Sequence, residues 1–424
     1  MTKLTAADLF VYDVIVVGGG PIGTMAARYA KLNGVSHVLV IEENASIGSP
    51  VECTGLLSAA ALRETDMEPN PSFVFNSVKG ADVYPPNGHC LKIEGKEVKA
   101  YVVSRKMFDR QLAEKAAKEG AEFQLKTQAV DLKRETVCGN EIWALGVFAG
   151  GNLKTLYTKI IIAADGVRSR TARLAGLKPC EKVLSGIQIE AVYHSNDTDF
   201  VEMFVGSAAP GFFGWAVPVN ENISRIGLAV DLDAAAKQNK KNGSDDTKSA
   251  YDYLSELLQS PILSQKTAGG NTDFVVGGIP IGPMKKTYAA GLMVVGDAAG
   301  QCKPISGGGI YTGAVAAKIA ADVASEAILE NDFSEKKMSL YEKRWKKELG
   351  RELDIGMAAH AYRMKLEDKE MNDIFETLND PEILNLITEH GDMDHPSVLI
   401  RKLMLSKHSL KMMKLAGTFF KTVL

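Results

Sequence analysis

The sequence predicts an α/β protein, α+β overall, with an inserted antiparallel sheet and a C-terminal helical region. A β-branched strand at residues 13–17 runs into a glycine-rich turn and a helix at 24–33, and a similar strand-to-turn pattern recurs after residues 160 and 291. Between these segments lie strand-rich stretches. After about residue 330 the composition becomes rich in Lys, Glu, Leu and Met, which is typical of helices.

The composition excludes several classes of function. The 424 residues are 46% hydrophobic and 24% charged, which suits a globular protein of two or three domains. The net charge of −3 gives no indication of nucleic-acid binding. The five cysteines are scattered without metal-ligand spacing, which predicts free thiols, no disulfide framework and no metal site.

No stretch approaches the roughly 20 apolar residues that a membrane-spanning helix needs. The first ten residues lack the basic-then-apolar layout of a signal peptide. These observations predict a cytoplasmic protein and leave a peripheral contact with the inner face of the cell membrane open.

The first glycine-rich turn, GGGPIG at residues 18–23, has the spacing of a dinucleotide-binding loop. Gly18 permits the tight turn, Gly20 lets the backbone approach a pyrophosphate, and Gly23 lets the helix pack closely on the strand. The start of the following helix then faces the phosphate charge. The pattern predicts a Rossmann-like dinucleotide-binding domain.

A second apolar strand at residues 38–41 ends in Glu42, nineteen residues after Gly23. A carboxylate at this distance accepts hydrogen bonds from a ribose hydroxyl, and Glu42 is preferred to Glu43 because it follows the strand directly. An acidic partner at this position fits FAD or NAD and disfavours NADP.

Two later segments repeat the strand-to-turn layout. One ends in Asp165 and Gly166, and the other in Gly296 and Asp297. After the latter, a glycine run that includes Gly308 and Gly309 opens an Ala-rich helix. In a flavin site Asp297 would bind a ribityl hydroxyl, and these glycine amides would face the pyrimidine edge. Each segment alone is equally well explained as a turn with a capping Asp.

Together the three segments resemble the glutathione-reductase-2 type flavoproteins, a group that includes aromatic-ring hydroxylases and geranylgeranyl reductases. The resemblance covers about residues 10–330 and implies FAD, with the two later segments as the second and third fingerprints. It also places Arg105, at a helix start, near the cofactor. The alternative for Arg105 is an ordinary salt bridge.

Two further segments resemble the archaeal geranylgeranyl reductases: GSPVECTG at 48–55 and PGFFGWAVP at 210–218. The resemblance implies that Cys53 faces the flavin and is the catalytic candidate, and that an isoprenoid cavity is lined by Phe213, Trp215 and Pro218. Phe213 replaces a Tyr of the family, so any role of that hydroxyl does not transfer. Val217 replaces a Phe, and Cys302 and Lys303 also depart from the pattern. The alternatives are an inert buried thiol and a core tryptophan.

The predicted function is therefore flavin-dependent reduction of the C=C bonds of geranylgeranyl groups in (di)geranylgeranylglyceryl lipids, giving saturated archaeal ether lipids. Such an alkene is not polarised, so hydride transfer needs an accompanying proton and a dry site. The alternatives are an FAD-dependent aromatic-ring monooxygenase and a dehydrogenase that passes electrons to quinone. No second dinucleotide loop is evident, so the electron donor is either NAD(P)H that binds transiently or a protein such as ferredoxin.

The predicted organisation is discontinuous. The FAD-binding domain takes residues 1–71, 104–180 and 279–330, the substrate-binding sheet takes 72–103 and 181–278, and the helical region takes 331–424. A polar stretch at 237–248 is expected to be an exposed loop. Residues 396–424 contain six Lys or Arg and no acid, which suits either a membrane-facing amphipathic tail or a packed helix with a solvated basic face.

Overall fold

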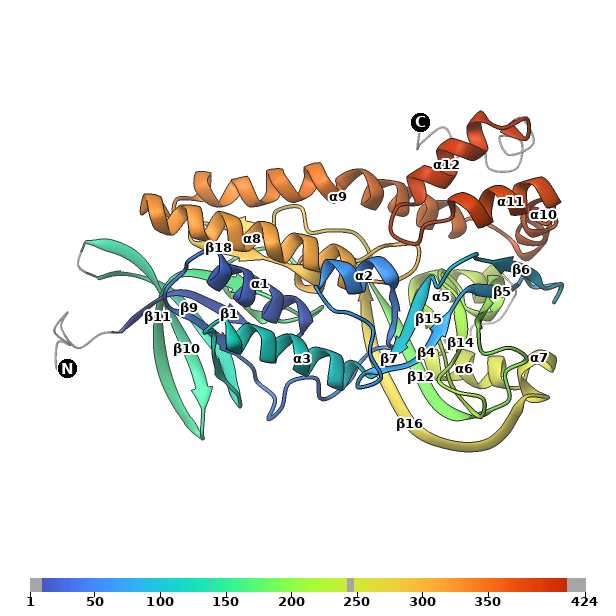
Figure 1. Cartoon of the computed structure of the whole chain (residues 1–424), viewed down its shortest axis with the longest axis horizontal. Coiled ribbons are helices and arrows are strands. Elements are labelled where there is room, and N and C mark those ends of the chain that lie inside the picture. The colour runs from blue at the N-terminus through green and yellow to red at the C-terminus, as the bar shows by residue number, and fades with distance from the viewer. Residues whose placement is uncertain (1–9, 138, 242–247, 410–424) are drawn as a thin grey trace.

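In the computed structural model, which describes residues 10–409 apart from 138 and 242–247, a largely parallel sheet occupies one end of an elongated molecule (Figure 1). The order β18-β11-β1-β2-β8 is parallel throughout, while β17, β10 and β9 add antiparallel partners. Its strands are β1 (Val11–Val17), β2 (Val38–Ile41), β8 (Glu122–Gln124), β9 (Thr127–Val137), β10 (Asn140–Ala149), β11 (Asn152–Ala163), β17 (Tyr288–Ala289) and β18 (Leu292–Val294).

Both faces of this sheet are covered, which is why its central strands are apolar without alternation. Val14 and Val16 pack toward the helices, and Ile15 and Val17 pack toward the β9–β10 ribbon. The helices of this end are α1 (Pro21–Leu32), α2 (Ala59–Glu64), α3 (Arg105–Lys118), α4 (Arg170–Leu174) and α8 (Ile310–Glu330), with a 3₁₀ turn η2 (Gly296–Ala299).

A second sheet lies at the other end of the molecule, and its long strand β16 curves from the centre to that end (Figure 1). Its order is β16-β12-β15-β14-β13-β5-β6, antiparallel except for the β13–β5 pair. Its strands are β5 (Gly80–Tyr84), β6 (Leu91–Glu94), β12 (Val183–Tyr193), β13 (Phe200–Phe204), β14 (Gly214–Pro218), β15 (Ile223–Val230) and β16 (Thr267–Pro280).

The stretch at 72–103 divides between two sheets. Only β5 and β6 join the large one, whereas β4 (Val74–Val78) and β7 (Ala100–Val103) pair with β3 (Leu56–Ser58) in a small separate sheet. The other elements near the second sheet are α6 (Ala250–Leu258), α7 (Pro261–Ser264) and the 3₁₀ turn η1 (Gly206–Ala208). The structure shows which strands share a sheet, and the domain boundaries stay predictions.

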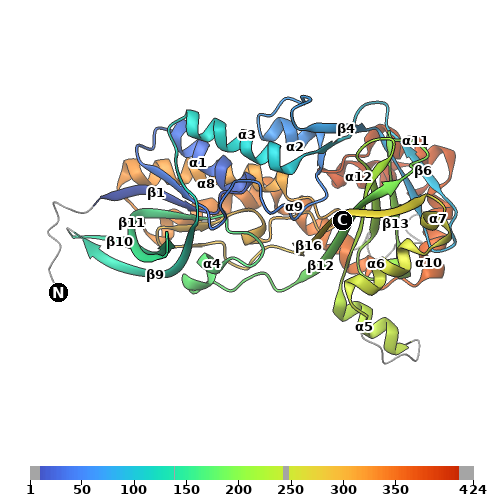
Figure 2. The same ribbon diagram turned by 90° about the horizontal axis from the view of Figure 1, so that it is seen from below.

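The expectation of a loop at 237–248 is wrong for residues 237–241, and residues 242–247 of that stretch lie outside the described residues. Helix α5 (Leu232–Lys241) projects from the second sheet (Figure 2) and continues to Lys241. Its start is stabilised by Asp231, whose Oδ1 accepts hydrogen bonds from the amides of Asp233 and Ala234 at 3.1 Å each.

The C-terminal region is helical, as predicted, with α9 (Glu335–Arg363), α10 (Asp368–Leu378), α11 (Pro381–His390) and α12 (Pro396–Leu405). Helix α9 runs along α8 above the first sheet and reaches the second sheet, where α10 to α12 gather (Figure 1). Of the basic tail, the part from residue 410, with Lys411, Lys414 and Lys421, lies outside the described residues. None of the described helices is long and apolar enough to cross a bilayer.

Candidate active site

The glycines of the turn between β1 and α1 have two different roles, close packing of the backbone and open space for a ligand. A Cβ at Gly18, where φ is +106°, would lie 2.3 Å from the carbonyl oxygen of Ala164, and one at Gly23 would lie 1.9 Å from that of Gly18. Both glycines are therefore required by packing within the chain. A Cβ at Gly20 would meet nothing within 4 Å. The space above Gly20, at the start of α1, fits a bound pyrophosphate.

Glu42 lies beside this turn, at the end of β2. Its Oε2 accepts a hydrogen bond from the Gly19 amide at 2.8 Å, and its Oε1 accepts two from Asn44, both at 2.8 Å. Glu43 instead accepts a hydrogen bond from Gln128, away from the turn. The structure thus brings Glu42, the preferred carboxylate, to the glycine loop, and its contact with ribose stays a prediction.

Asp165 follows β11 and stabilises the start of α4, whose N-cap residue is Ser169. Its Oδ2 accepts a hydrogen bond from the Thr171 amide at 2.9 Å, and its Oδ1 accepts one from the Ser169 hydroxyl. Asp165 therefore stabilises a helix start, and any contact with the cofactor would be made in addition to these hydrogen bonds.

The third segment packs directly on the first. A Cβ at Gly296 would lie 3.0 Å from Cγ2 of Ile22, in the first turn of α1. Asp297 lies at the start of α8, because a Cβ at Gly309 would be 2.6 Å from Asp297 Oδ1. Gly308 is covered by Lys303, whose Cε would be 3.0 Å from a Cβ there. Segments almost 300 residues apart thus form one surface.

A charged cluster lies next to this surface. Arg105 forms a salt bridge with Asp109 through Nε at 3.0 Å and Nη2 at 3.1 Å. Burial opposes the charge of Arg105, but Asp109 and the Cys53 thiol outweigh it and raise the pKa of Arg105. Burial raises the pKa of Asp297, and Arg105 opposes that rise. Arg105 therefore makes the salt bridge of the alternative interpretation and is also close to both Cys53 and Asp297, and its contact with the cofactor stays a prediction.

Cys302 is a member of this neighbourhood that sequence reasoning did not place. It is 1% exposed, and its pKa is raised first by burial and then by Asp297, with a smaller effect of Cys53. The only signal in the sequence was its departure from the family pattern.

The loop that carries Cys53 is held by Arg225 of β15. The Nη1 group of Arg225 donates hydrogen bonds to the carbonyl oxygens of Thr54 at 2.6 Å and Val103 at 3.0 Å, and its Nε donates to Glu190 at 3.1 Å. Sequence reasoning missed Arg225. A signal was present, because Arg225 is the charged residue in a strand of otherwise small and apolar side chains.

The aromatic segment, residues 210–218, also lies near the third glycine segment, residues 307–309. Phe212 and Phe213 are stacked with ring centroids 4.3 Å apart, and Phe213 meets Trp215 edge-on at 6.0 Å. A Cβ at Gly307 would lie 3.3 Å from Cζ of Phe212. Phe212 itself is 1% exposed.

The other two predicted substrate residues differ in position. Trp215 is partly buried and is fixed by a 3.0 Å hydrogen bond from Nε1 to Gln188 Oε1. Pro218 lies at the far end of β14, where its carbonyl oxygen accepts a hydrogen bond from Asn76. The structure therefore brings the start of the aromatic segment, rather than Pro218, close to Gly307. Within the described residues, no three Cys, His, Asp or Glu side chains are grouped as metal ligands.

The family model described as FAD binding domain matches residues 11–325 of the chain. This match, together with the glycine turn at residues 18–23 and the region around Asp297, shows that the chain is an FAD-binding oxidoreductase. A solved flavin-dependent brominase, 16% identical with a TM-score of 0.69 over 95% of this chain and all of that one, shares the fold alone.

The curated relatives are more specific. Digeranylgeranylglycerophospholipid reductase from Methanocaldococcus jannaschii is 37% identical over 87% of this chain and 91% of the relative, and the enzyme of that name from Methanosarcina acetivorans is 34% identical over 87% and 89%. A solved geranylgeranyl bacteriochlorophyll reductase-like protein from Thermoplasma acidophilum is 30% identical, with a TM-score of 0.80 over 96% of this chain and all of that one. The chain belongs to the digeranylgeranylglycerophospholipid reductase family.

Proposed function

We propose that the protein reduces the C=C bonds of geranylgeranyl groups in digeranylgeranylglyceryl lipids and phospholipids, forming saturated archaeal ether lipids. The observation that supports this most is the contact between Gly307 of the third glycine segment and Phe212 of the aromatic segment. An apolar chain lying along Phe212 and Phe213 would be held beside the flavin. The membership of the reductase family points the same way.

Gly18, Gly20, Gly23 and Glu42 are proposed to hold the adenosine and pyrophosphate half of FAD. Asp297 and the amides of Gly308 and Gly309 are proposed to hold the other half. When bound there in its reduced form, FAD would supply the hydride that one carbon of the alkene needs. The aromatic segment keeps water from the reacting bond, because its rings are stacked on one another and largely buried.

Cys53 is proposed to give the proton that the second alkene carbon needs. Transfer of the thiol proton leaves a thiolate, and the Arg105 guanidinium next to Cys53 stabilises that negative charge. Solvent then returns a proton to the sulfur. One hydride and one proton together saturate one double bond.

The competing functions make different demands. A monooxygenase would consume oxygen with NAD(P)H, whereas the reductase needs no oxygen, so an oxygen electrode separates the two. A quinone-reducing dehydrogenase would pass electrons to a soluble quinone analogue without any lipid product. Two electron donors are proposed, NAD(P)H that binds transiently or a ferredoxin, and each is tested by the rate at which it bleaches the bound flavin under argon.

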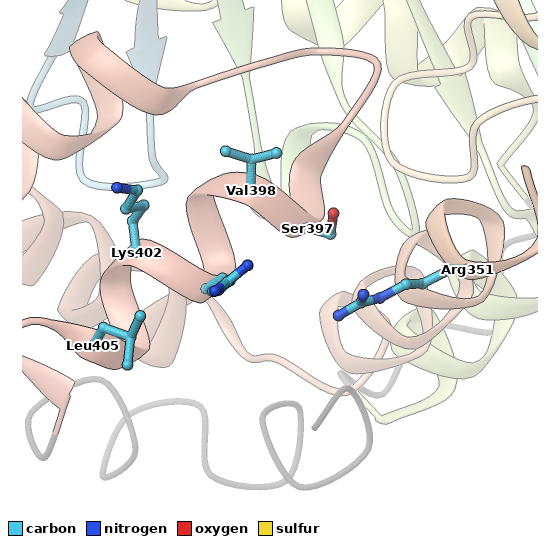
Figure 3. A pocket seen from close by; sticks show the side chains of 6 residues that line it. Arg351, Ser397, Val398, Lys402 and Leu405 are labelled. Carbon is cyan, nitrogen blue, oxygen red and sulfur yellow. The ribbon is translucent and has the colours of Figure 1, made fainter. Parts of the chain in front are cut away.

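A peripheral contact with the inner face of the membrane is proposed for the face formed by α9 and α12. A surface hollow of about 310 Å³ lies between them (Figure 3), with lining residues Arg351, Ser397, Val398, Arg401, Lys402 and Leu405. Three of these are cationic, and Leu405 and Val398 are 75% and 44% exposed. Cations beside exposed apolar side chains suit an anionic lipid surface.

Liposome flotation tests this contact. The Arg401→Gln and Lys402→Gln double variant should bind vesicles of anionic lipid less than the parent protein does. Equal binding by the two proteins would end this part of the proposal.

A further inference from the structure

The last turn of α9 carries two polar side chains that bind each other. The Nη2 group of Arg363 lies 3.1 Å from Nδ1 of His360. A guanidinium can only donate, so Nδ1 accepts and the proton of a neutral His360 is on Nε2. Burial, together with the charges of Arg363 and Lys182, lowers the pKa of His360 to about 4, so the ring is neutral at pH 7. His360 is 4% exposed, and its Nε2 group is buried without a hydrogen-bond partner.

Arg363 also has a buried donor without a hydrogen-bond partner. Its Nη1 group donates to the carbonyl oxygen of Ile305 at 3.4 Å, and its guanidinium lies over the Phe212 ring at 4.7 Å. Its Nε group is buried without a partner, and burial lowers the pKa of Arg363 to about 10. The partial negative charge at the C-terminal end of α9 favours a cation in this turn. It does not provide a hydrogen-bond acceptor for Nε of Arg363.

Two other cations of this region are paired with carboxylates in the part of the chain that the structure describes. They are Lys182 with Asp231, whose charge also acts on His360, and Lys303 with Asp394. Within the same part of the chain, no carboxylate lies within ion-pair distance of Arg363. The Oγ atom of Ser306, which follows Ile305, is also buried without a partner. A buried cation without a carboxylate, next to a histidine N–H group without an acceptor, costs free energy, and an anion that accepts hydrogen bonds from both would remove that cost.

We propose that Arg363, His360 and Ser306 form a binding site for the phosphate group of the isoprenoid lipid, at the point where the polar head adjoins the apolar chains. Phosphate oxygens accept hydrogen bonds from a guanidinium fork and from N–H and O–H groups at once. The Phe212 ring, over which Arg363 lies, is also near Gly307, where an added Cβ would be 3.3 Å from Cζ of Phe212. The site therefore has a cation, Arg363, for the phosphate group next to an aromatic ring, Phe212, for the apolar chain of the same lipid molecule.

The inference rests on the proposed function, and its test separates the two. Binding of detergent-dispersed digeranylgeranylglyceryl phosphate and of neutral digeranylgeranylglycerol is measured by calorimetry on the FAD-loaded protein. Arg363→Gln should weaken binding of the phosphate lipid by about tenfold or more, because a charge-assisted contact is lost, and leave the neutral lipid within about twofold. Lys347→Gln, which removes an exposed cation from the same helix, should change neither.

Ser306→Ala removes only one hydroxyl, so it keeps the test valid if Arg363→Gln loses its fold. It should weaken binding of the phosphate lipid about threefold to tenfold. Equal loss of affinity for both lipids in these variants would overturn the site. So would inorganic phosphate that binds as tightly as the phosphate lipid, since the ligand would then be the free ion. If the parent protein shows the phosphate preference but hydrogenates neither lipid, the proposed function fails and the site stands.

Discussion

Arg225 of the second sheet donates a 2.6 Å hydrogen bond to the carbonyl oxygen of Thr54, the residue after Cys53. The candidate catalytic loop of the flavin-binding end is thus fixed by a side chain of the other sheet. The same guanidinium is paired with Glu190, and its side chain is only 13% exposed. This cation therefore links the loop of Cys53 to the second sheet, which also carries the aromatic segment.

Replacing this cation should separate positioning from cofactor binding. Arg225→Met removes the contacts to Thr54, Val103 and Glu190, and we expect about 2 kcal/mol lower stability to denaturant because hydrogen bonds to a charged group are lost. The kcat for lipid reduction should fall while the FAD content stays unchanged. Arg225→Lys should recover part of the loss. An unchanged kcat in Arg225→Met would show that the loop needs no support from the second sheet.

Two glycines of the first turn should respond oppositely to alanine. Gly20→Ala adds a methyl group where the protein has open space, so the chain should fold normally but lose FAD, because the methyl group occupies the place proposed for the pyrophosphate. Gly23→Ala should fold poorly, since its Cβ would lie 1.9 Å from the Gly18 carbonyl oxygen. The measurements are the thermal midpoint of the apoprotein and the ratio of flavin to protein absorbance. Normal FAD binding by Gly20→Ala would contradict the proposed pyrophosphate site at Gly20.

The thiol of Cys53 should matter for chemistry and not for the cofactor. Cys53→Ser should lower the rate of lipid reduction by about tenfold or more, since a serine hydroxyl is a much weaker acid than a thiol. The flavin spectrum should stay unchanged. The exposed Cys90 provides the control, and Cys90→Ser should be fully active. Full activity of Cys53→Ser would remove the cysteine from the mechanism.

His360 gives the stability a defined pH dependence. Its pKa is lowered from 6.5 to about 4 by burial, Arg363 and Lys182, so between these values the unfolded chain binds more protons than the folded protein. Stability therefore falls as the pH is lowered through this window, and His360 accounts for about 1.5 kcal/mol of loss from pH 6.5 to pH 5. Chemical denaturation of His360→Gln at the two pH values should show a loss that is smaller by this amount. Equal losses in both proteins would contradict a buried neutral ring.

Local sequence signals predicted the parts of the fold that depend on short-range chemistry. The apolar strand at 13–17, the glycine turn and the helices after residue 330 follow from periodicity and turn preferences, and the structure has them. The same reasoning took 237–241 for a loop, because it weighed the polar side chains and not the helix start at Asp231.

The missed site residues depend on distant partners. Arg225, His360 and Arg363 carry no motif, and their roles arise only when strands and helices far apart in the chain meet. Asp165 is a different case. The alternative of an Asp that stabilises a helix start was predicted from its position after a strand, and the structure identifies Ser169 and Thr171 as the residues that donate to its oxygens.

The most direct measurement of the central claim is the mass of the lipid after incubation with the chemically reduced, FAD-loaded protein under argon. We expect digeranylgeranylglyceryl lipid to gain two hydrogens for each double bond reduced, and to form about tenfold less reduced lipid, or still less, with Cys53→Ser over the same time. Lipid of unchanged mass after incubation with a fully loaded and reduced parent protein would contradict the account.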